Sequence, residues 1–416
     1  MTAPRPHDPY AALRFPAFRW FILSLMALTV ALQMQTVVVG WQVYAITHDP
    51  LSLGLVGLAE ALPFIAVALV AGHVADRRDR RQVALVALAA LLVCGAALLA
   101  FSLSPHLLAR GRVWPIYVVV LFSGIARSFF LPARTALSAE IVPRELYPGA
   151  VAWRSSTWQF AAVMGPALGG LLYGFRSAAA AYGVAVVLTL IAYGTLVQVP
   201  PTGRVPAAST HSVAESLGSG IRFLRSRQVL LGAMTLDLFS VLFGGATALL
   251  PIFAADILHV GPQGLGVLRA APAAGAVLMS IVLAHRPPMR HAGRALLVAV
   301  GVFGLCMLGF GLSRSFALSI GLLALSGMVD NVSVVVRSTL VQVLTPEHLL
   351  GRVSALNQIF IGSSNEIGEF ESGVAAKLIG VVPSVVVGAT ITLLVVAATA
   401  WRAPQLRRLR EIRSDG

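Results

Sequence analysis

The chain has 416 residues, of which 57% are hydrophobic and only 12% are charged, and its mean hydropathy is +0.83. Soluble domains carry about 25% charged residues, so this composition excludes a soluble protein and indicates a chain that crosses a membrane many times. The net charge of +14 comes almost wholly from arginines in short segments between apolar runs, which favours a role in membrane orientation over nucleic-acid binding.

Twelve apolar runs are long enough to cross a bilayer, which takes about 20 helical residues. The first run is too long for the core of a signal peptide, so we expect it to be retained as a span. The sequence therefore predicts an all-α membrane protein with twelve transmembrane helices. They cover residues 18–45, 52–75, 82–104, 113–136, 150–174, 179–199, 229–255, 263–285, 294–313, 316–341, 353–379 and 382–401.

One long polar stretch divides the twelve runs into six and six. It is rich in proline, glycine, serine and threonine, and a short amphipathic helix is expected over residues 213–224. We therefore predict an N-terminal six-helix bundle over residues 1–199, a cytoplasmic linker over residues 200–228, and a C-terminal six-helix bundle with a basic cytoplasmic tail over residues 229–416.

The basic residues predict the orientation of the chain. With the N-terminus inside, 24 arginines fall on the cytoplasmic side, against 5 basic residues on the outer side, one of which is the only lysine, Lys377. Basic residues are enriched in cytoplasmic loops, so we expect both termini to lie in the cytoplasm, in a bacterial inner membrane.

The two halves of the chain resemble each other. A shift of 203 residues places Arg134 on Arg337, and it also places Gly165 on Gly368 and Gly170 on Gly373. Two similar six-span halves are typical of a transporter whose binding site lies between the repeats.

The loop after the second span carries a dense set of charges that cannot lie in hydrocarbon. Its sequence, Gly72-His-Val-Ala-Asp-Arg-Arg-Asp-Arg-Arg81, resembles the G-x-L-A-D-R-x-G-R-R signature of the major facilitator superfamily, with Asp79 in place of the usual glycine. The resemblance implies two pseudo-symmetric six-helix bundles that work by alternating access. It also implies a cytoplasmic gate, in which Asp76 would lie near Arg134 and latch the halves together. The residues assigned to this gate are Gly72, Asp76, Arg77, Arg80, Arg81 and Arg134.

Other motifs indicate a branch of that superfamily. Residues 131–134, 140–143 and 364–373 are similar to the enterobactin-exporter-like group of bacterial efflux transporters. The fifth span carries a run that resembles the G-P-x-x-G-G core of the antiporter motif of the superfamily. An alternative interpretation of this run is ordinary close packing of helices. Its motif residues are Gly165, Pro166, Gly169 and Gly170.

The eleventh span holds three glutamates. Glu366 and Glu369 share one helix face with Gly362 and Gly373, whereas Glu371 points roughly the opposite way. Two neighbouring carboxylates repel each other, so we expect one of them to exchange a proton during transport. The alternative is a structural polar patch that is bound to neighbouring helices.

Further polar residues fall inside spans one, four, seven and ten, which line the central cavity in the resembled superfamily. The resemblance implies that they contact substrate or take part in proton coupling, and the alternative is that they form buried pairs that hold helices in register. This set comprises Arg127, Asp237, Asp330, Asn331 and Gln33, with Gln35 beside it. Glu60, Arg269 and Glu371 are assigned to the interface between the bundles.

No nucleotide-binding loop, metal-ligand spacing or nucleophile–base arrangement is present, so we expect no cofactor and no enzymatic activity. Cys94 and Cys306 fall in opposite halves and are interpreted as buried apolar residues. The sequence predicts a monomeric secondary transporter that exports a small amphiphile, such as a siderophore or a drug, and that is driven by protons. The alternatives are an importer or facilitator on the same fold, or a membrane receptor or assembly partner that does not transport.

Overall fold

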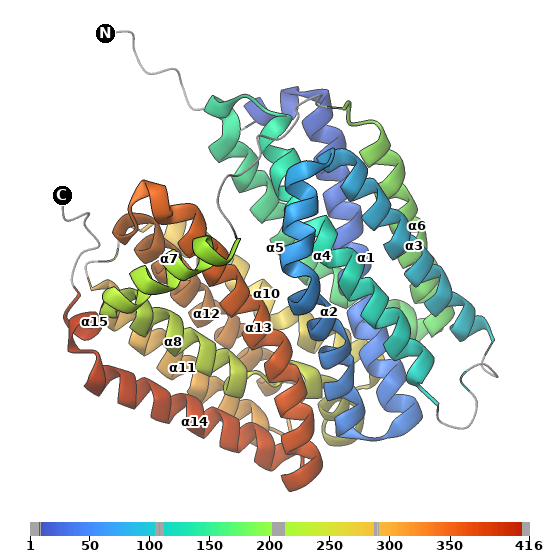
Figure 1. Cartoon of the computed structure of the whole chain (residues 1–416). Coiled ribbons are helices and arrows are strands. Elements are labelled where there is room, and N and C mark those ends of the chain that lie inside the picture. Colours follow the sequence, from blue (N-terminus) through green and yellow to red (C-terminus); the bar gives the residue numbers. More distant parts are fainter. Residues whose placement is uncertain are drawn as a thin grey trace. The chain divides into compact units, whose positions relative to one another are not determined.

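The computed structural model describes residues 8, 10–104, 108, 112–201, 213–286, 289 and 291–409. These residues form helices joined by short loops, with no strand among them (Figure 1). Apolar runs of about 20 residues become helices because a helix satisfies every backbone hydrogen bond within one segment, as a membrane requires.

All twelve predicted spans are helical in the structure, and together they confirm the predicted fold class. The six of the first half are α1 (Pro16–Thr47), α2 (Pro50–Arg77), α3 (Arg80–Leu103), α4 (Trp114–Glu140), α5 (Tyr147–Phe175) and α6 (Ala178–Val197). The second half continues with α8 (Gln228–Gly244), α10 (Gly261–Ala284), α11 (Ala292–Leu312), α12 (Phe316–Leu344), α13 (Glu347–Ile379) and α14 (Val381–Arg402). The shorter elements are η1 (Ala11–Arg14), η3 (Arg144–Leu146), α7 (Val213–Ser226) and α15 (Pro404–Arg408).

The seventh span is interrupted, although its sequence was expected to form one continuous helix. α8 ends at Gly244, and the chain continues through η4 (Thr247–Leu249), α9 (Leu250–Ile252) and the π-helical η5 (Phe253–Ile257). Adjacent glycines at 244 and 245, followed by Pro251, explain the break, because glycine weakens a helix and proline removes a backbone donor.

Ten helical segments of the described residues are long and apolar enough to cross a membrane on their own. α5 and α13 are as long, with 29 and 33 residues, but glycines dilute the apolar content of α5 and glutamates that of α13. Such helices are stable in a bilayer when their polar residues face other helices or a water-filled cavity.

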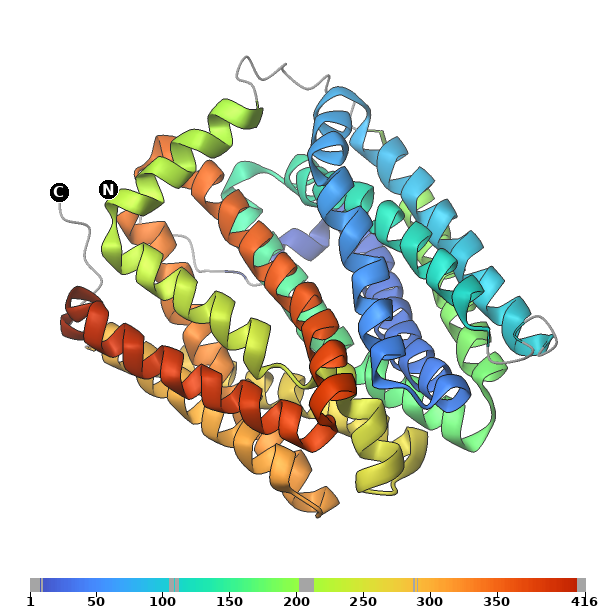
Figure 2. The same cartoon turned by 60° about the horizontal axis from the view of Figure 1, so that its bottom comes forward.

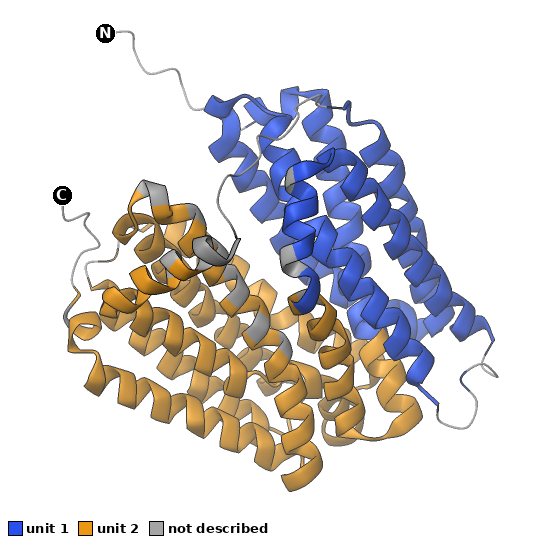
Figure 3. Cartoon of the chain, viewed as in Figure 1, with its two compact units in different colours: residues 1–38, 66–209 blue, residues 39–65, 210–416 orange. Residues whose placement is uncertain are grey.

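The chain divides into two compact units (Figure 3). The first unit comprises residues 1–38 and 66–209, and the second comprises residues 39–65 and 210–416. The hairpin between α1 and α2 therefore belongs to the second unit, whereas most of α1 and the last part of α2 belong to the first unit. The predicted bundle boundaries at residues 199 and 229 stay a prediction.

Each unit has its own apolar core. In the first unit, α1, α3, α4 and α6 bury the large side chains of Phe18, Leu28, Leu88, Leu137 and Leu196. In the second unit, α8, α11, α12, α13 and α15 bury Leu230, Leu296, Leu340, Val353 and Leu406.

Candidate functional site

The charged loop after α2 is very short. α2 ends at Arg77 and α3 begins at Arg80, and the carboxylate of Asp79 accepts a hydrogen bond of 2.9 Å from the backbone N–H of Arg81. Asp79 is therefore the N-cap of α3. Aspartate is among the preferred N-cap residues, which explains why it occupies the position of the usual glycine.

Two arginines of this loop bind the ends of other helices in the first unit. Arg80 forms an ion pair with Glu140, the last residue of α4, and the Glu140 side chain is only 6% exposed. The Nη2 of Arg81 donates a hydrogen bond of 2.7 Å to the carbonyl oxygen of Val197, the last residue of α6. These contacts join the start of α3 to the ends of α4 and α6, and the second one satisfies a helix C-terminal carbonyl.

The remaining predicted gate residues are less constrained. The guanidinium of Arg134 lies 5.8 Å from the centre of the Phe130 ring, and its buried Nε has no hydrogen-bond partner among the described residues. Arg77 is exposed, and no described atom lies within 4 Å of a Cβ added at Gly72. The side chain of Asp76 lies outside the described residues, so its predicted contact with Arg134 stays a prediction.

The glycines of the antiporter-like run are contact points between α5 and α1. A Cβ added at Gly165 would overlap Gln33 and lie 3.0 Å from the Val30 carbonyl oxygen, and one added at Gly169 would lie 3.0 Å from the Met34 carbonyl oxygen. Pro166 and Gly170 are buried beside them within a continuous helix. The run brings the backbones of α5 and α1 together, as small residues do between membrane helices.

The second unit repeats this packing. Gly368, which the shift of 203 residues aligns with Gly165, lies in α13, and a Cβ added there would lie 2.9 Å from the Leu242 carbonyl oxygen of α8. Figure 2 shows α13 beside α8. The sequence repeat is therefore also a repeat of helix contacts.

A buried ion pair joins α8 to α12. Arg337 pairs with Asp237, and the two residues are 3% and 7% exposed. Arg337 falls within the predicted tenth span, residues 316–341, and it lies inside α12, which continues to Leu344. Asp237 was assigned to substrate contact or proton coupling, but in the structure its carboxylate forms an ion pair with Arg337.

The middle of α12 contacts α10. The side-chain amide of Asn331 is buried and donates a hydrogen bond of 2.9 Å to the Ser280 hydroxyl. The preceding residue, Asp330, is half-buried, as are Arg127 in α4 and Gln33 in α1. Arg127 and Gln33 belong to the first unit and Asp330 to the second, so a substrate site that they share stays a prediction.

An ion pair joins a residue assigned to the bundle interface with one assigned to proton coupling. The Nη2 of Arg269 in α10 lies 3.7 Å from the Oε1 of Glu369 in α13, and its Nη1 donates to the carbonyl oxygen of Thr247 at 3.3 Å. The side chain of Glu366 lies outside the described residues. Glu371 and Glu60 are half-buried in the same unit.

The hairpin between α1 and α2 is bound to other helices of the second unit by contacts that sequence reasoning missed. Asp49 pairs with Lys377 of α13 at 3.0 Å, and the Tyr44 hydroxyl donates to Asp256 of η5. A Cβ added at Gly373 would lie 2.6 Å from the Cα of Gly54, so α2 and α13 cross at two glycines. In the sequence, Lys377 stood out as the only lysine and Gly373 as the repeat partner of Gly170.

Within the described part of the chain, no group of three histidine, cysteine, aspartate or glutamate side chains is placed to hold a metal ion. The charged groups instead occur as pairs and single contacts between helices. Such an arrangement can bind and release protons and can link or release helices.

Known proteins resemble this chain over most of its length. A model of the family described as transmembrane secretion effector, MFS_3, matches residues 7–415. The enterobactin exporter EntS of Citrobacter koseri is 29% identical over 399 residues, which cover 94% of both chains. EntS of Escherichia coli is 31% identical over 345 residues, covering 82% of this chain and 80% of its own length.

Solved transporter structures show the same fold at low sequence identity. The nucleoside transporter NupG superposes with a TM-score of 0.71 and 13% identity, covering 93% of this chain and 98% of its own. A bacterial homologue of the human lysosomal transporter Spinster, in an inward-facing and unoccupied conformation, gives a TM-score of 0.70 with 15% identity, covering 94% and 98%.

The spanning helices and these relatives together indicate a multi-pass protein of the inner membrane. The family match covers nearly every residue, and the fold is that of the superfamily that the loop Gly72–Arg81 resembles. This chain belongs to the transmembrane secretion effector family of major facilitator superfamily transporters, in the branch of the enterobactin exporters.

Proposed function

We propose that this transporter exports a small amphiphilic molecule of the siderophore type and exchanges it for protons. The similarity to enterobactin exporters along almost the whole of both chains supports this class of cargo and this direction. Both termini lie in the cytoplasm in this proposal, and the loop Gly72–Arg81 faces the cytoplasm, because that orientation places most arginines inside.

The Arg269–Glu369 ion pair is the observation that carries the coupling mechanism. Both side chains lie in membrane-spanning helices, where a charge is stable only with a partner or water. A proton that binds Glu369 neutralises the carboxylate and removes its attraction to Arg269. The arginine keeps its hydrogen bond to the Thr247 carbonyl oxygen, so α13 is the element that is released from α10.

Release of α13 upon protonation links proton entry to the change of access. When the carboxylate loses its proton on the cytoplasmic side, the ion pair forms again and returns α13 to α10. Repetition of these two steps moves one proton inward for each return of the transporter. The pair is half-buried, with side chains 20% and 30% exposed, and it is weakened when one partner loses its charge.

Transport in proteoliposomes tests the proposal. Vesicles with an acidic lumen are expected to accumulate enterobactin from outside when they contain the wild-type protein. Glu369→Gln is expected to abolish this gradient-driven accumulation but to retain exchange of internal for external enterobactin, because the glutamine mimics the protonated state. Glu145→Gln, which removes an exposed carboxylate of the first unit, is the matched control and is expected to behave like the wild type.

Two results would contradict the proposal separately. If the wild-type protein accumulates no enterobactin, whether the vesicle lumen is more acidic or more alkaline than the outside, the cargo assignment is wrong. If Glu369→Gln accumulates cargo as the wild type does and responds equally to the gradient, the coupling role of Glu369 is wrong.

A further inference from the structure

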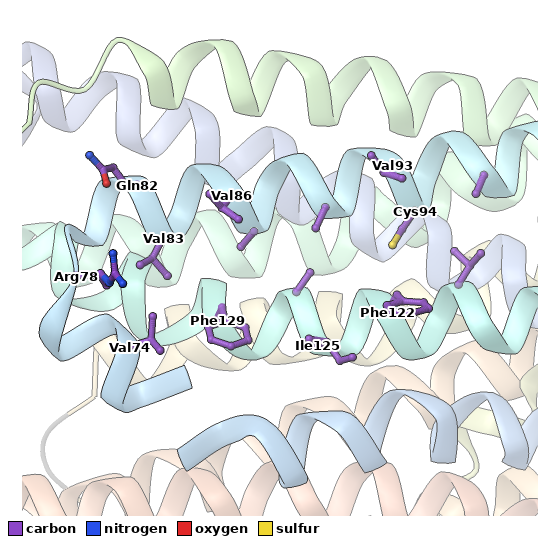
Figure 4. A pocket seen from close by; sticks show the side chains of 15 residues that line it. Val74, Arg78, Gln82, Val83, Val86, Val93, Cys94, Phe122, Ile125 and Phe129 are labelled. Atoms are coloured by element: carbon purple, nitrogen blue, oxygen red, sulfur yellow. The ribbon is translucent and has the colours of Figure 1, made fainter. Parts of the chain in front are cut away.

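A groove of about 730 Å³ lies in the first unit between α3, α4 and the end of α2 (Figure 4). Its walls are formed by Val83, Val86 and Val93 of α3 and by Phe122, Ile125 and Phe129 of α4. The volume is in the range of sites that hold small molecules or parts of larger ones.

The groove is open along the outer surface of these helices. Val86 is 71% exposed, Val93 is 68% exposed and Phe122 is 57% exposed. All three lie in helices that are long and apolar enough to cross a membrane, a setting in which an exposed apolar side chain can face lipid. From Gln82 to Ala97, α3 rises by about 22 Å, which makes the groove long and narrow.

The polar groups of the groove are gathered at one end. Arg78 and Gln82 lie together beside the loop that begins α3, whereas the rest of the lining is apolar apart from the thiol of Cys94 (Figure 4). A site for a compact polar ligand would place several polar groups around it. A groove that is charged at one end and apolar along its length instead fits a molecule with an anionic head and a hydrocarbon chain.

Arg78 is available for such a head group. Its neighbours Arg80 and Arg81 are occupied by Glu140 and by the Val197 carbonyl oxygen. Arg78 is exposed, and no described residue forms an ion pair with it. An exposed arginine at a membrane surface attracts anionic lipids.

We propose that the groove binds one acyl chain of an anionic phospholipid, with the phosphate on Arg78 and the Gln82 amide as a further donor. The bound lipid lies against α3 and α4 and places a negative charge next to the start of α3, where Arg80 and Arg81 bind the ends of α4 and α6. It thereby stabilises this end of the first unit. The proposal is independent of the cargo and of the direction of transport.

Lipid binding by the full-length purified protein tests the proposal. The delipidated protein in detergent is titrated with phosphatidylglycerol or with phosphatidylcholine of the same acyl chains, and bound lipid is counted by native mass spectrometry. The wild type is expected to prefer phosphatidylglycerol by roughly fivefold, the factor expected for one arginine near an anionic lipid. Arg78→Gln is expected to lose this preference, whereas Arg286→Gln, which removes an exposed arginine of the second unit, is expected to keep it.

Two further variants locate the lipid. Ala90→Trp fills the groove and is expected to reduce binding of both lipids, and Ala90→Leu serves if the tryptophan variant does not fold.

Three results would overturn the proposal. Equal binding of the two lipids by the wild type would exclude a head-group site, and an equal loss of preference in Arg286→Gln would show that the effect is only one of net charge. Displacement of the lipid by enterobactin would identify the groove as a path for cargo instead.

Discussion

At the residue scale, individual buried ion pairs contribute strongly to the stability of the protein. A charge buried between membrane helices is costly unless a partner neutralises it. Asp237 and Arg337 meet this condition for each other, since both are buried and they lie on different helices. This ion pair gives Asp237 a structural role that does not require contact with substrate.

Removing one partner of this pair is expected to destabilise the protein strongly. Asp237→Ala leaves Arg337 buried without compensation, which costs about 3–5 kcal/mol for pairs of this kind. The loss should appear as a lower apparent melting temperature of the purified protein in detergent.

The double variant Asp237→Leu with Arg337→Leu is the control for this prediction. Because it removes both charges, most of the lost stability should return. A single Asp237→Ala variant as stable as the wild type would show that water or another group compensates Arg337, and Asp237 would then be open to a role in transport.

Glycine contacts organise the packing at the scale of elements. Gly165 brings α5 onto α1, and Gly368 brings α13 onto α8. Gly183 in α6 differs from both, since no described atom lies within 4 Å of a Cβ added there. The chain therefore offers a matched comparison between crowded and open glycines.

Alanine is expected to have opposite effects at these positions. Gly183→Ala should stabilise the protein by about 0.4–1 kcal/mol, because alanine reduces the freedom of the unfolded chain and fits the helix. Gly165→Ala and Gly368→Ala should destabilise it, by about 1–3 kcal/mol, because the new methyl group meets the neighbouring helix.

Melting temperatures of the three single variants measure these effects. If Gly165→Ala and Gly183→Ala shift the melting temperature in the same direction, the inferred close packing of α5 against α1 is wrong. If Gly368→Ala alone behaves like Gly183→Ala, the second unit does not repeat the close helix contact that Gly165 makes in the first unit.

The helices could be predicted from the sequence because hydrophobicity and length determine them locally. The amphipathic helix of the linker was expected over residues 213–224 and is observed as α7, and all twelve spans were expected. The break after Gly244 was missed, although two glycines and Pro251 signalled it. A run of apolar residues says little about where a helix bends.

The contacts between side chains were much harder to predict. The pairs Arg269–Glu369 and Asp49–Lys377 join residues 100 and 328 positions apart, and no local pattern links such residues. The pairing of Arg337 with Asp237 was also not predicted, because the two residues lie on different helices. The role of Asp79 could have been found, because aspartate immediately before a helix is a common N-cap.

At the scale of the whole molecule, the hairpin between α1 and α2 is the segment whose contacts should depend on the transport cycle. In sequence it lies between two parts of the first unit, but it is bound to α13 and η5 in the second unit through Lys377 and Asp256. A transporter that alternates access has to make and break contacts between segments of its two halves. The Asp49–Lys377 pair is partly exposed, with side chains 29% and 53% exposed, and is therefore weak enough to open.

Labelling of Lys377 reports on this pair directly, because the chain has no other lysine. Asp49→Asn is expected to raise the rate at which an amine-reactive probe modifies Lys377 by up to about fivefold, the factor that corresponds to a surface ion pair. The modified peptide is quantified by mass spectrometry, which separates Lys377 from the N-terminal amine. Glu145→Gln changes the net charge equally in the first unit and is expected to leave the rate unchanged.

The same measurement tests whether the hairpin moves during transport. In wild-type proteoliposomes, a proton gradient with enterobactin is expected to change the labelling rate of Lys377, because turnover alters the time that the lysine spends paired with Asp49. In Asp49→Asn the rate should no longer respond, since there is no pair to open. A wild-type rate that is the same with and without turnover would mean that the hairpin stays bound to α13 throughout the cycle, and the moving contacts would have to lie elsewhere in the chain.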